Sequence, residues 1–92
     1  LINYHVAWMQ QRGLIPNYQA SVAKTFGTEL HQRLANTGMH LLGLYGALNE
    51  DSKWVQLKGK INYLYLWTVG ETIYAGSNEI QRNILAKAAL GL

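Results

Sequence analysis

Hydrophobic residues recur at the three- and four-residue spacing of amphipathic helices over most of this chain. Residues 1–12 predict a first helix, which Gly13 and Pro16 terminate. Asn17 is a suitable cap for a long second helix that runs to about residue 42. The apolar stripe of this second helix consists of Val22, Phe26, Leu30, Leu34, Thr37 and Leu41. We expect this stripe to form the spine of the hydrophobic core.

Two glycines lie inside the predicted second helix, Gly27 and Gly38. A glycine within a helix costs about 1 kcal/mol relative to alanine. We therefore expect another backbone to approach the helix closely at these positions.

The second half of the chain predicts two further helices. Residues 43–46 end the long helix, and residues 49–52 form a polar loop. A third helix is expected over about residues 57–69, with Gly70 as its end, and a fourth from residue 77 onward. No segment has the alternating pattern of a strand. The predicted fold class is therefore all-α, an antiparallel four-helix bundle.

The start of the fourth helix carries the candidate chemistry. Gly76 interrupts an apolar, β-branched run, and Ser77 or Asn78 can cap the helix that follows. A glycine turn before a capped helix leaves several backbone N–H groups directed at one place, which suits a carbonyl, carboxylate or phosphate oxygen. The residues alone leave two interpretations open, a simple helix cap and an oxyanion or phosphate site.

Composition excludes several other functions. With 92 residues, 49% of them hydrophobic, and a single proline, the chain is expected to form one small folded domain. The absence of cysteine excludes disulfides and thiolate metal sites, and no pair of histidines has ligand spacing, so no metal site is expected. The eight basic residues are scattered, which argues against nucleic acid, and no apolar run reaches the ~20 residues that cross a bilayer. The chain begins without methionine, inside an apparent helix, and we expect a fragment of a longer protein.

Aromatic residues are numerous for so small a core. They are Tyr4, Trp8, Tyr18, Tyr45, Trp54, Tyr63, Tyr65, Trp67 and Tyr74. Either several are buried with their polar ends in water, or they contact another subunit or domain.

Three motifs resemble the C-terminal domain of the acyl-CoA dehydrogenase family. Residues 76–82 read Gly-Ser-Asn-Glu-Ile-Gln-Arg, where the family has Gly-Thr-Ser-Glu-Ile-Gln-Arg, and the chain ends in the typical Leu-Gly-Leu. Residues 20–26 resemble the family's Ala-Lys helix, and residues 40–46 resemble its Gln-x-x-Gly-Gly-x-Gly turn. The resemblance covers nearly the whole chain. It implies that residues 1–92 are a C-terminal helical domain without the family's N-terminal helical and middle β domains.

The resemblance implies α,β-dehydrogenation of an acyl-CoA thioester with FAD as cofactor. A carboxylate takes the α-proton while the β-hydrogen leaves as hydride to the flavin. Because the α-proton is weakly acidic, the thioester carbonyl must be polarised by hydrogen-bond donors. In the family these are a flavin ribityl hydroxyl and a backbone N–H, which by position belongs to Ala75. Tyr74 and Gly76 flank it as substrate-binding residues.

The sequence departs from the family pattern at the same position. Many members have the catalytic glutamate directly before the motif glycine, where this chain has Ala75. The isovaleryl and long-chain branches also lack that glutamate and carry their base on an earlier helix. Either the base lies upstream of residue 1, or this subunit is catalytically silent within a hetero-oligomer. Glu71 and Glu79 are interpreted as surface carboxylates.

The cofactor contacts implied by the resemblance fall in two segments. His40, Gly43 and Leu44 match a turn that reaches the FAD of a neighbouring subunit, although the family usually has glutamine at His40 and often glycine at Leu44. Ser77 and Glu79 match positions near the adenosine part of the flavin. Without the resemblance, His40 is simply a helix-end histidine favoured by the helix dipole.

The implied partners are an acyl-CoA substrate, electron-transfer flavoprotein or a similar acceptor, and further subunits in a homo- or hetero-oligomeric dimer or tetramer. The implied location is the bacterial cytoplasm, or the mitochondrial matrix in a eukaryote. The competing hypothesis is a non-enzymatic helical module that serves in assembly. A base-bearing upstream helix would favour the enzyme, and a companion chain with glutamate before the glycine would favour the structural role.

Overall fold

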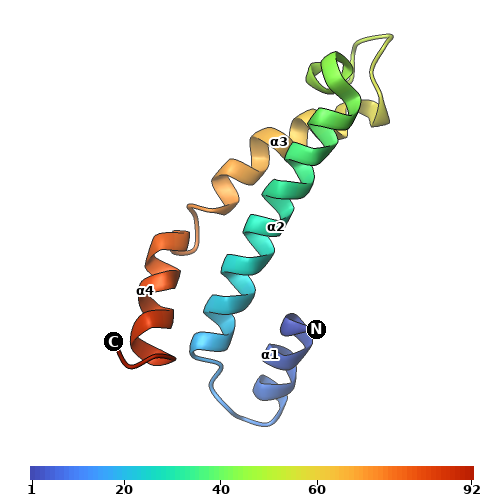
Figure 1. Ribbon diagram of the computed structural model, residues 1–92. Helices are drawn as coiled ribbons and strands as arrows, with labels where there is room; N and C mark the ends of the chain where they lie inside the picture. The colour runs from blue at the N-terminus through green and yellow to red at the C-terminus, as the bar shows by residue number, and fades with distance from the viewer. The chain divides into compact units, whose positions relative to one another are not determined.

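The computed structural model describes residues 1–92 and contains helices but no strand (Figure 1). The helices are α1 (Ile2–Gln11), α2 (Tyr18–Leu42), α3 (Lys60–Glu71) and α4 (Asn78–Ala88), with two short 3₁₀ helices, η1 (Gly43–Ala47) and η2 (Leu57–Gly59). The all-α class and the four predicted helices are confirmed.

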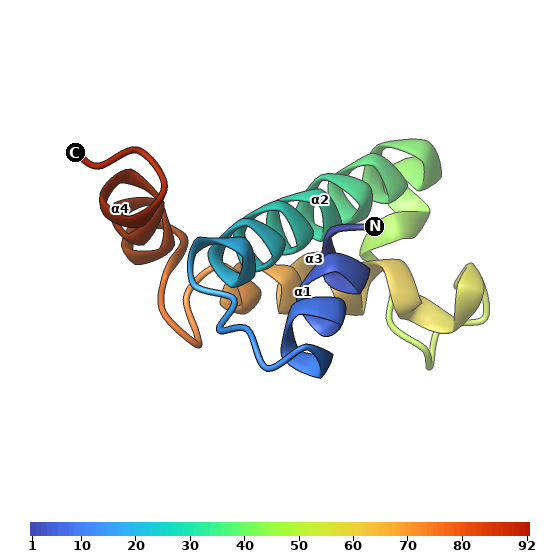
Figure 2. The same cartoon turned by 90° about the horizontal axis from the view of Figure 1, so that it is seen from below.

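The chain divides into two compact units. The first comprises residues 1–27 and 73–92, and the second comprises residues 28–72. In the first unit, the loop after α1 brings that helix back beside the first turns of α2 (Figure 2). A pocket of about 410 Å³ lies between them, lined by Leu1, Ile2, His5, Tyr18, Gln19 and Val22.

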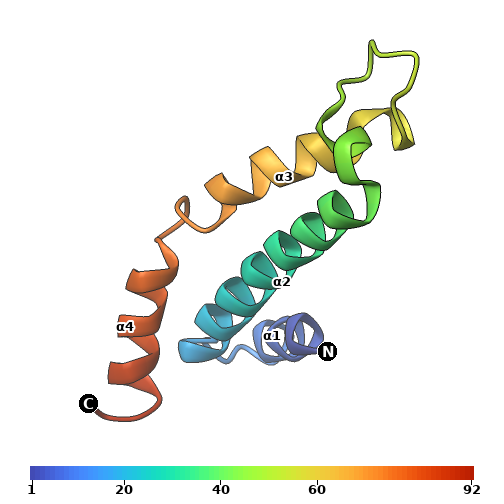
Figure 3. The same cartoon turned by 45° about the horizontal axis from the view of Figure 1, so that its top comes forward.

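Two contacts in the second unit show that α3 runs antiparallel to α2. A Cβ at Gly38 would lie 3.1 Å from the Ile61 side chain, whereas His31 is hydrogen-bonded to Glu71. Since the later residue of α2 meets the earlier residue of α3, the two helices run in opposite directions (Figure 3).

The predicted core stripe of α2 lies on the exposed side of the helix. Phe26, Leu34 and Leu41 are 50%, 60% and 82% exposed. The buried residues of α2 are Ser21, Thr25 and Ala35. The prediction that the large apolar stripe forms the core is wrong, because small side chains occupy the buried face and leave the large ones outside.

The interior glycines of α2 behave differently from each other. At Gly38, two atoms of the Ile61 side chain lie 3.1 Å from the position of a Cβ, so the helices are close there. At Gly27, nothing lies within 4 Å of that position. The expected close approach occurs at Gly38 alone, and it involves a side chain rather than a backbone.

The third helix has different ends from those predicted. Its α-helical part begins at Lys60 and continues through Gly70 to Glu71, one residue beyond the predicted end at Gly70. The Thr72 hydroxyl donates to the Val69 carbonyl at 2.8 Å, and the Glu71 side chain is bound by a residue of α2. These bonds stabilise the last turn and offset the low helix propensity of glycine.

All nine Tyr and Trp residues named above are exposed. Tyr63 and Trp67, one turn apart on α3, stack with ring centroids 6.0 Å apart and an interplanar angle of 12°. The interpretation that several aromatics are buried within this chain is therefore wrong.

Candidate functional site

Helix α4 begins with a side-chain cap, as predicted. The Ser77 hydroxyl oxygen accepts the backbone N–H of Ile80 at 3.3 Å. This bond satisfies one of the N–H groups that have no partner inside a helix. Of the two predicted caps, Ser77 is the one that acts.

Asn78 has a different role at the first position of α4. It is only 3% exposed, and its side-chain oxygen accepts a hydrogen bond from Nζ of Lys24 at 2.8 Å. Lys24 comes from the early part of α2, so this bond attaches the start of α4 to α2 within the first unit. The cation also lies at the positive end of the α4 dipole, where its charge is unfavourable, and the hydrogen bond compensates for that.

The turn before α4 has an uncommon backbone. Ala75 and Gly76 both lie in the left-handed region, with φ of 55° and 80°. Glycine adopts this conformation freely, whereas a residue with a Cβ pays about 1–2 kcal/mol. Strain of this kind persists where the surroundings enforce it, and it is concentrated at binding and catalytic sites.

The strained turn presents two adjacent hydrogen-bond donors at the surface. Ala75 and Gly76 are exposed, and their N–H groups make no hydrogen bond within the chain. An oxygen of a bound molecule can therefore accept from either group without displacing an internal partner. Tyr74, the other predicted substrate-binding residue, precedes them and is exposed as well.

One side chain closes this turn, and the sequence analysis did not single it out. Nε2 of Gln81, one turn into α4, donates to the Ala75 carbonyl oxygen at 3.1 Å. The same nitrogen would be 2.7 Å from a Cβ at Gly76. The sequence signal for this bond is a glutamine five residues after a glycine, in the first turns of a capped helix.

The other predicted cofactor residues surround the end of α2 in the second unit. His40 is exposed in the last turn of α2, Gly43 has φ of 57° with nothing near its Cβ position, and Leu44 is 93% exposed. The imidazole of His40 and the open backbone at Gly43 are groups that can bind polar atoms. Leu44 offers only apolar contact through its side chain.

The two predicted cofactor residues of the first unit differ in what they can offer. The Ser77 oxygen already accepts the Ile80 N–H, so its hydroxyl hydrogen is the group left for a ligand. Glu79 lies exposed in the first turn of α4, where the helix dipole favours a negative charge. Both are compatible with contacts to hydroxyl groups of a nucleotide.

Glu71 is not the surface carboxylate that the sequence indicated. It is buried, and its Oε2 lies 2.8 Å from Nδ1 of His31. Thr68, one turn earlier on α3, has no exposed surface. Residues three apart in a helix lie on the same face, so the position of Glu71 relative to Thr68 could have indicated that Glu71 is buried.

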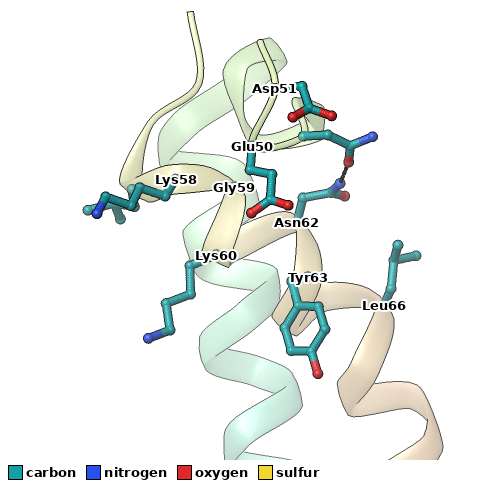
Figure 4. Close-up of a pocket in the computed structure, with 10 residues that line it drawn as sticks. Glu50, Asp51, Lys58, Gly59, Lys60, Asn62, Tyr63 and Leu66 are labelled. Carbon is teal, nitrogen blue, oxygen red and sulfur yellow. Dashed lines mark hydrogen bonds between the residues drawn. The ribbon is translucent and has the colours of Figure 1, made fainter. Parts of the chain in front are cut away.

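A pocket of about 720 Å³ lies in the second unit at the start of α3 (Figure 4). Nδ2 of Asn62 donates to Oδ1 of Asn49 at 2.8 Å beside it, and Tyr63 and Leu66 form part of its wall. Its lining residues include Glu50, Asp51, Lys58 and Lys60. The opposite charges are balanced, and none of the predicted site residues lines this pocket.

The structure brings together no group of three His, Cys, Asp or Glu side chains that could hold a metal ion. No helix has both the length and the apolar character that a bilayer span requires.

Comparison with known proteins gives consistent matches over the whole chain. The family model described as "Acyl-CoA dehydrogenase, C-terminal domain" matches residues 1–90. Acyl-CoA dehydrogenase IpdE1 of Mycobacterium tuberculosis is 36% identical over 90 residues, which cover 98% of this chain and 22% of IpdE1. An acyl-CoA dehydrogenase of Bacillus subtilis is 31% identical over 96 residues, which cover 96% of this chain and 21% of that protein.

Two solved structures have the same fold. The ChsE4-ChsE5 complex from M. tuberculosis matches with a TM-score of 0.88 and 36% identity, covering 99% of this chain and 23% of the matched chain. The Tcur3481-Tcur3483 steroid ACAD matches with a TM-score of 0.92 and 26% identity, covering 99% and 24%. The chain thus spans between a fifth and a quarter of the length of these relatives.

Proposed function

Starting from the fact that this chain belongs to the acyl-CoA dehydrogenase family, as its C-terminal domain, we propose that the full-length protein dehydrogenates an acyl-CoA thioester between Cα and Cβ. The observation that carries the proposal is the strained turn at Ala75 and Gly76, with two exposed N–H groups that no internal partner uses. Such a turn suits an oxygen on which negative charge develops.

The turn acts on the thioester carbonyl. The N–H of Ala75 donates to the thioester oxygen, and Gly76 keeps the neighbouring backbone free of a side chain. Loss of the α-proton moves negative charge onto that oxygen, so the hydrogen bond is stronger in the transition state than in the bound substrate. Removal of one donor of this kind typically costs a factor of about 10²–10³ in turnover.

The proton acceptor comes from outside these 92 residues. Ala75 has no basic atom, and Glu71 is buried and bound to His31. Glu79 is exposed in the first turn of α4, and we assign it to a contact with the cofactor instead. We therefore assign the base to an upstream segment.

The proposed cofactor is FAD, which when bound accepts the hydride from the β-carbon. His40 and the backbone of Gly43 would hold it through hydrogen bonds, and Leu44 through apolar contact. The Ser77 hydroxyl and the Glu79 carboxylate would bind its hydroxyl groups. Electron-transfer flavoprotein or a similar protein is the proposed acceptor of the electrons.

The proposed substrate has a bulky acyl group, and Tyr74 forms part of its binding surface. An alanine at position 75 leaves space near the α-carbon that a glutamate side chain would fill. A similar protein, Tcur3481-Tcur3483, is described as a steroid ACAD, which supports a steroid-bearing acyl-CoA as a candidate. We propose a cytoplasmic location in a bacterium, because the relatives above are bacterial.

A second function, as a catalytically silent subunit of a hetero-oligomer, is favoured by one observation. Both similar structures are named as pairs of different proteins, ChsE4-ChsE5 and Tcur3481-Tcur3483. In that case the companion chain supplies the glutamate, and this chain contributes its exposed apolar faces to assembly.

Purification of the full-length protein with and without a companion subunit distinguishes the two functions. Our main proposal predicts bound flavin and oxidation of steroid-bearing acyl-CoA, and only the oxidation requires the upstream base. If replacing every upstream carboxylate near the flavin leaves turnover intact, the base belongs to the companion chain and the silent-subunit function is correct.

A further inference from the structure

Gln81 holds the carbonyl of Ala75 from within the same helix start. Its backbone N–H donates to the Ser77 carbonyl at 2.9 Å, which fixes Gln81 in the first turns of α4. Its side chain then reaches back six residues, and Nε2 donates to the Ala75 oxygen at 3.1 Å. This hydrogen bond closes a ring formed by the Gln81 side chain and the backbone between residues 75 and 81.

Gly76 leaves the space that the Gln81 amide occupies. A Cβ at position 76 would lie 2.7 Å from Nε2 of Gln81, so the amide would have to leave its present place, and the φ of 80° also disfavours a side chain. The glycine and the glutamine therefore depend on each other. The glycine allows the amide to lie over the turn, and the amide holds the peptide that joins residues 75 and 76.

Fixing the Ala75 carbonyl has a direct consequence for the donors. In a trans peptide the C=O and the following N–H point in opposite directions, so a held Ala75 oxygen sets the direction of the Gly76 N–H. It also sets the ψ angle of Ala75, and Ala75 has a positive φ that an alanine rarely adopts by itself. Without the bond, we expect Ala75 to adopt the negative φ that alanine favours, which changes the direction of its N–H.

We propose that Gln81 is a positioning residue that keeps Ala75 in its left-handed conformation and so directs the N–H group of Ala75 at the substrate oxygen. This inference rests on the proposed function of the turn. Gln81 itself touches neither the thioester nor the base.

The test uses the full-length protein with Gln81→Met, which keeps the length of the side chain and removes its donor. The matched control is Gln11→Met, at an exposed position of α1 with no recorded side-chain bond. We expect kcat to fall about 30-fold in Gln81→Met, less than the factor of about 10²–10³ for complete loss of a donor, because the N–H is misdirected rather than removed; flavin content and KM should be unchanged. Gln11→Met should match the unaltered protein.

A second readout separates positioning from simple support of the fold. A 3-thiaacyl-CoA loses its α-proton on binding but is not oxidised. The charge-transfer absorbance between the deprotonated molecule and the flavin therefore reports how acidic that proton is. We expect the Gln81→Met protein to require a pH at least one unit higher to form this band. A role in stability alone would lower the melting temperature and leave the band unchanged.

The rescue variant is Gln81→Met combined with Ala75→Gly, because glycine adopts the left-handed conformation without help. We expect the double variant to recover at least one third of the decrease in log kcat that Gln81→Met causes. If Gln81→Met does not fold, this double variant decides, and failure to recover turnover overturns the proposal. Equal kcat in Gln81→Met and Gln11→Met overturns it as well. Absence of dehydrogenation in the unaltered protein would instead refute the proposed function.

Discussion

Replacing His31 with alanine removes the donor to a buried carboxylate, and the structure sets the expected cost. Nδ1 of His31 lies 2.8 Å from Oε2 of Glu71, and the two side chains are 41% and 11% exposed. A hydrogen bond to a charged group contributes about 1.5–3 kcal/mol, whereas an exposed ion pair contributes about 0.2–1 kcal/mol. Since the acceptor is buried and the donor is partly exposed, we expect His31→Ala to lower the free energy of unfolding by about 2 kcal/mol.

A double-mutant cycle measures the contribution of this bond. The free energy of unfolding is determined by urea titration for His31→Ala, Glu71→Ala and the double variant. The coupling energy should be about 1–2 kcal/mol. The neutral imidazole still donates through Nδ1–H, so the bond does not require a protonated ring.

The control is His40→Ala, an exposed histidine on the same helix, which should change the free energy of unfolding by less than about 0.5 kcal/mol. A coupling energy below about 0.5 kcal/mol would show that solvent exposure of His31 cancels the bond, and the reasoning from burial would be wrong.

Three other predictions follow from the packing and the turn. Gly38→Ala should lower the free energy of unfolding by about 1 kcal/mol, because overpacking against Ile61 exceeds the gain in helix propensity. In an Ile61→Ala background the same substitution should raise the free energy of unfolding, and a decrease in both backgrounds would contradict this. Ala75→Glu in the full-length protein should lower turnover of bulky acyl-CoAs, and with the upstream base removed it should restore some activity; steady-state kinetics that show a simple gain on bulky substrates would be the contrary result. The isolated 92-residue chain should self-associate, because its large apolar side chains are exposed, and a monomer in sedimentation at micromolar concentration would refute this. It should bind no FAD, because the isoalloxazine site of the family also needs the middle β domain, and a yellow preparation would be the contrary result.

The sequence predicted the helices well because their signals are local. The cap at Ser77 and the ends of α2 depend on neighbouring residues alone, and both were correct within a residue or two. Helix α3 extends one residue past the predicted end at Gly70, where the side chain of Glu71 has a partner 40 residues away. No local pattern contains that partner.

The buried side of α2 could not be inferred from apolar spacing. The periodicity of Phe26, Leu34 and Leu41 defines a face, but burial depends on what packs against it. Small residues such as Ser21 and Ala35 allow close approach, and the structure buries that side instead.

The candidate site was located by sequence, but its geometry was not. The glycine before a capped helix indicated backbone donors, whereas the left-handed φ of Ala75 is a property that alanine seldom shows. The bond from Gln81 that accompanies this conformation involves an ordinary exposed-helix residue type, which composition and spacing do not distinguish.

The most direct test of the account is a crystal structure of the full-length protein with an unreactive acyl-CoA analogue bound. The quantity to measure is the distance from the Ala75 nitrogen to the thioester oxygen. We predict hydrogen-bond contact, about 2.7–3.2 Å, with Ala75 still in the left-handed region. A thioester oxygen that binds elsewhere, with the N–H of Ala75 left in water, would contradict it.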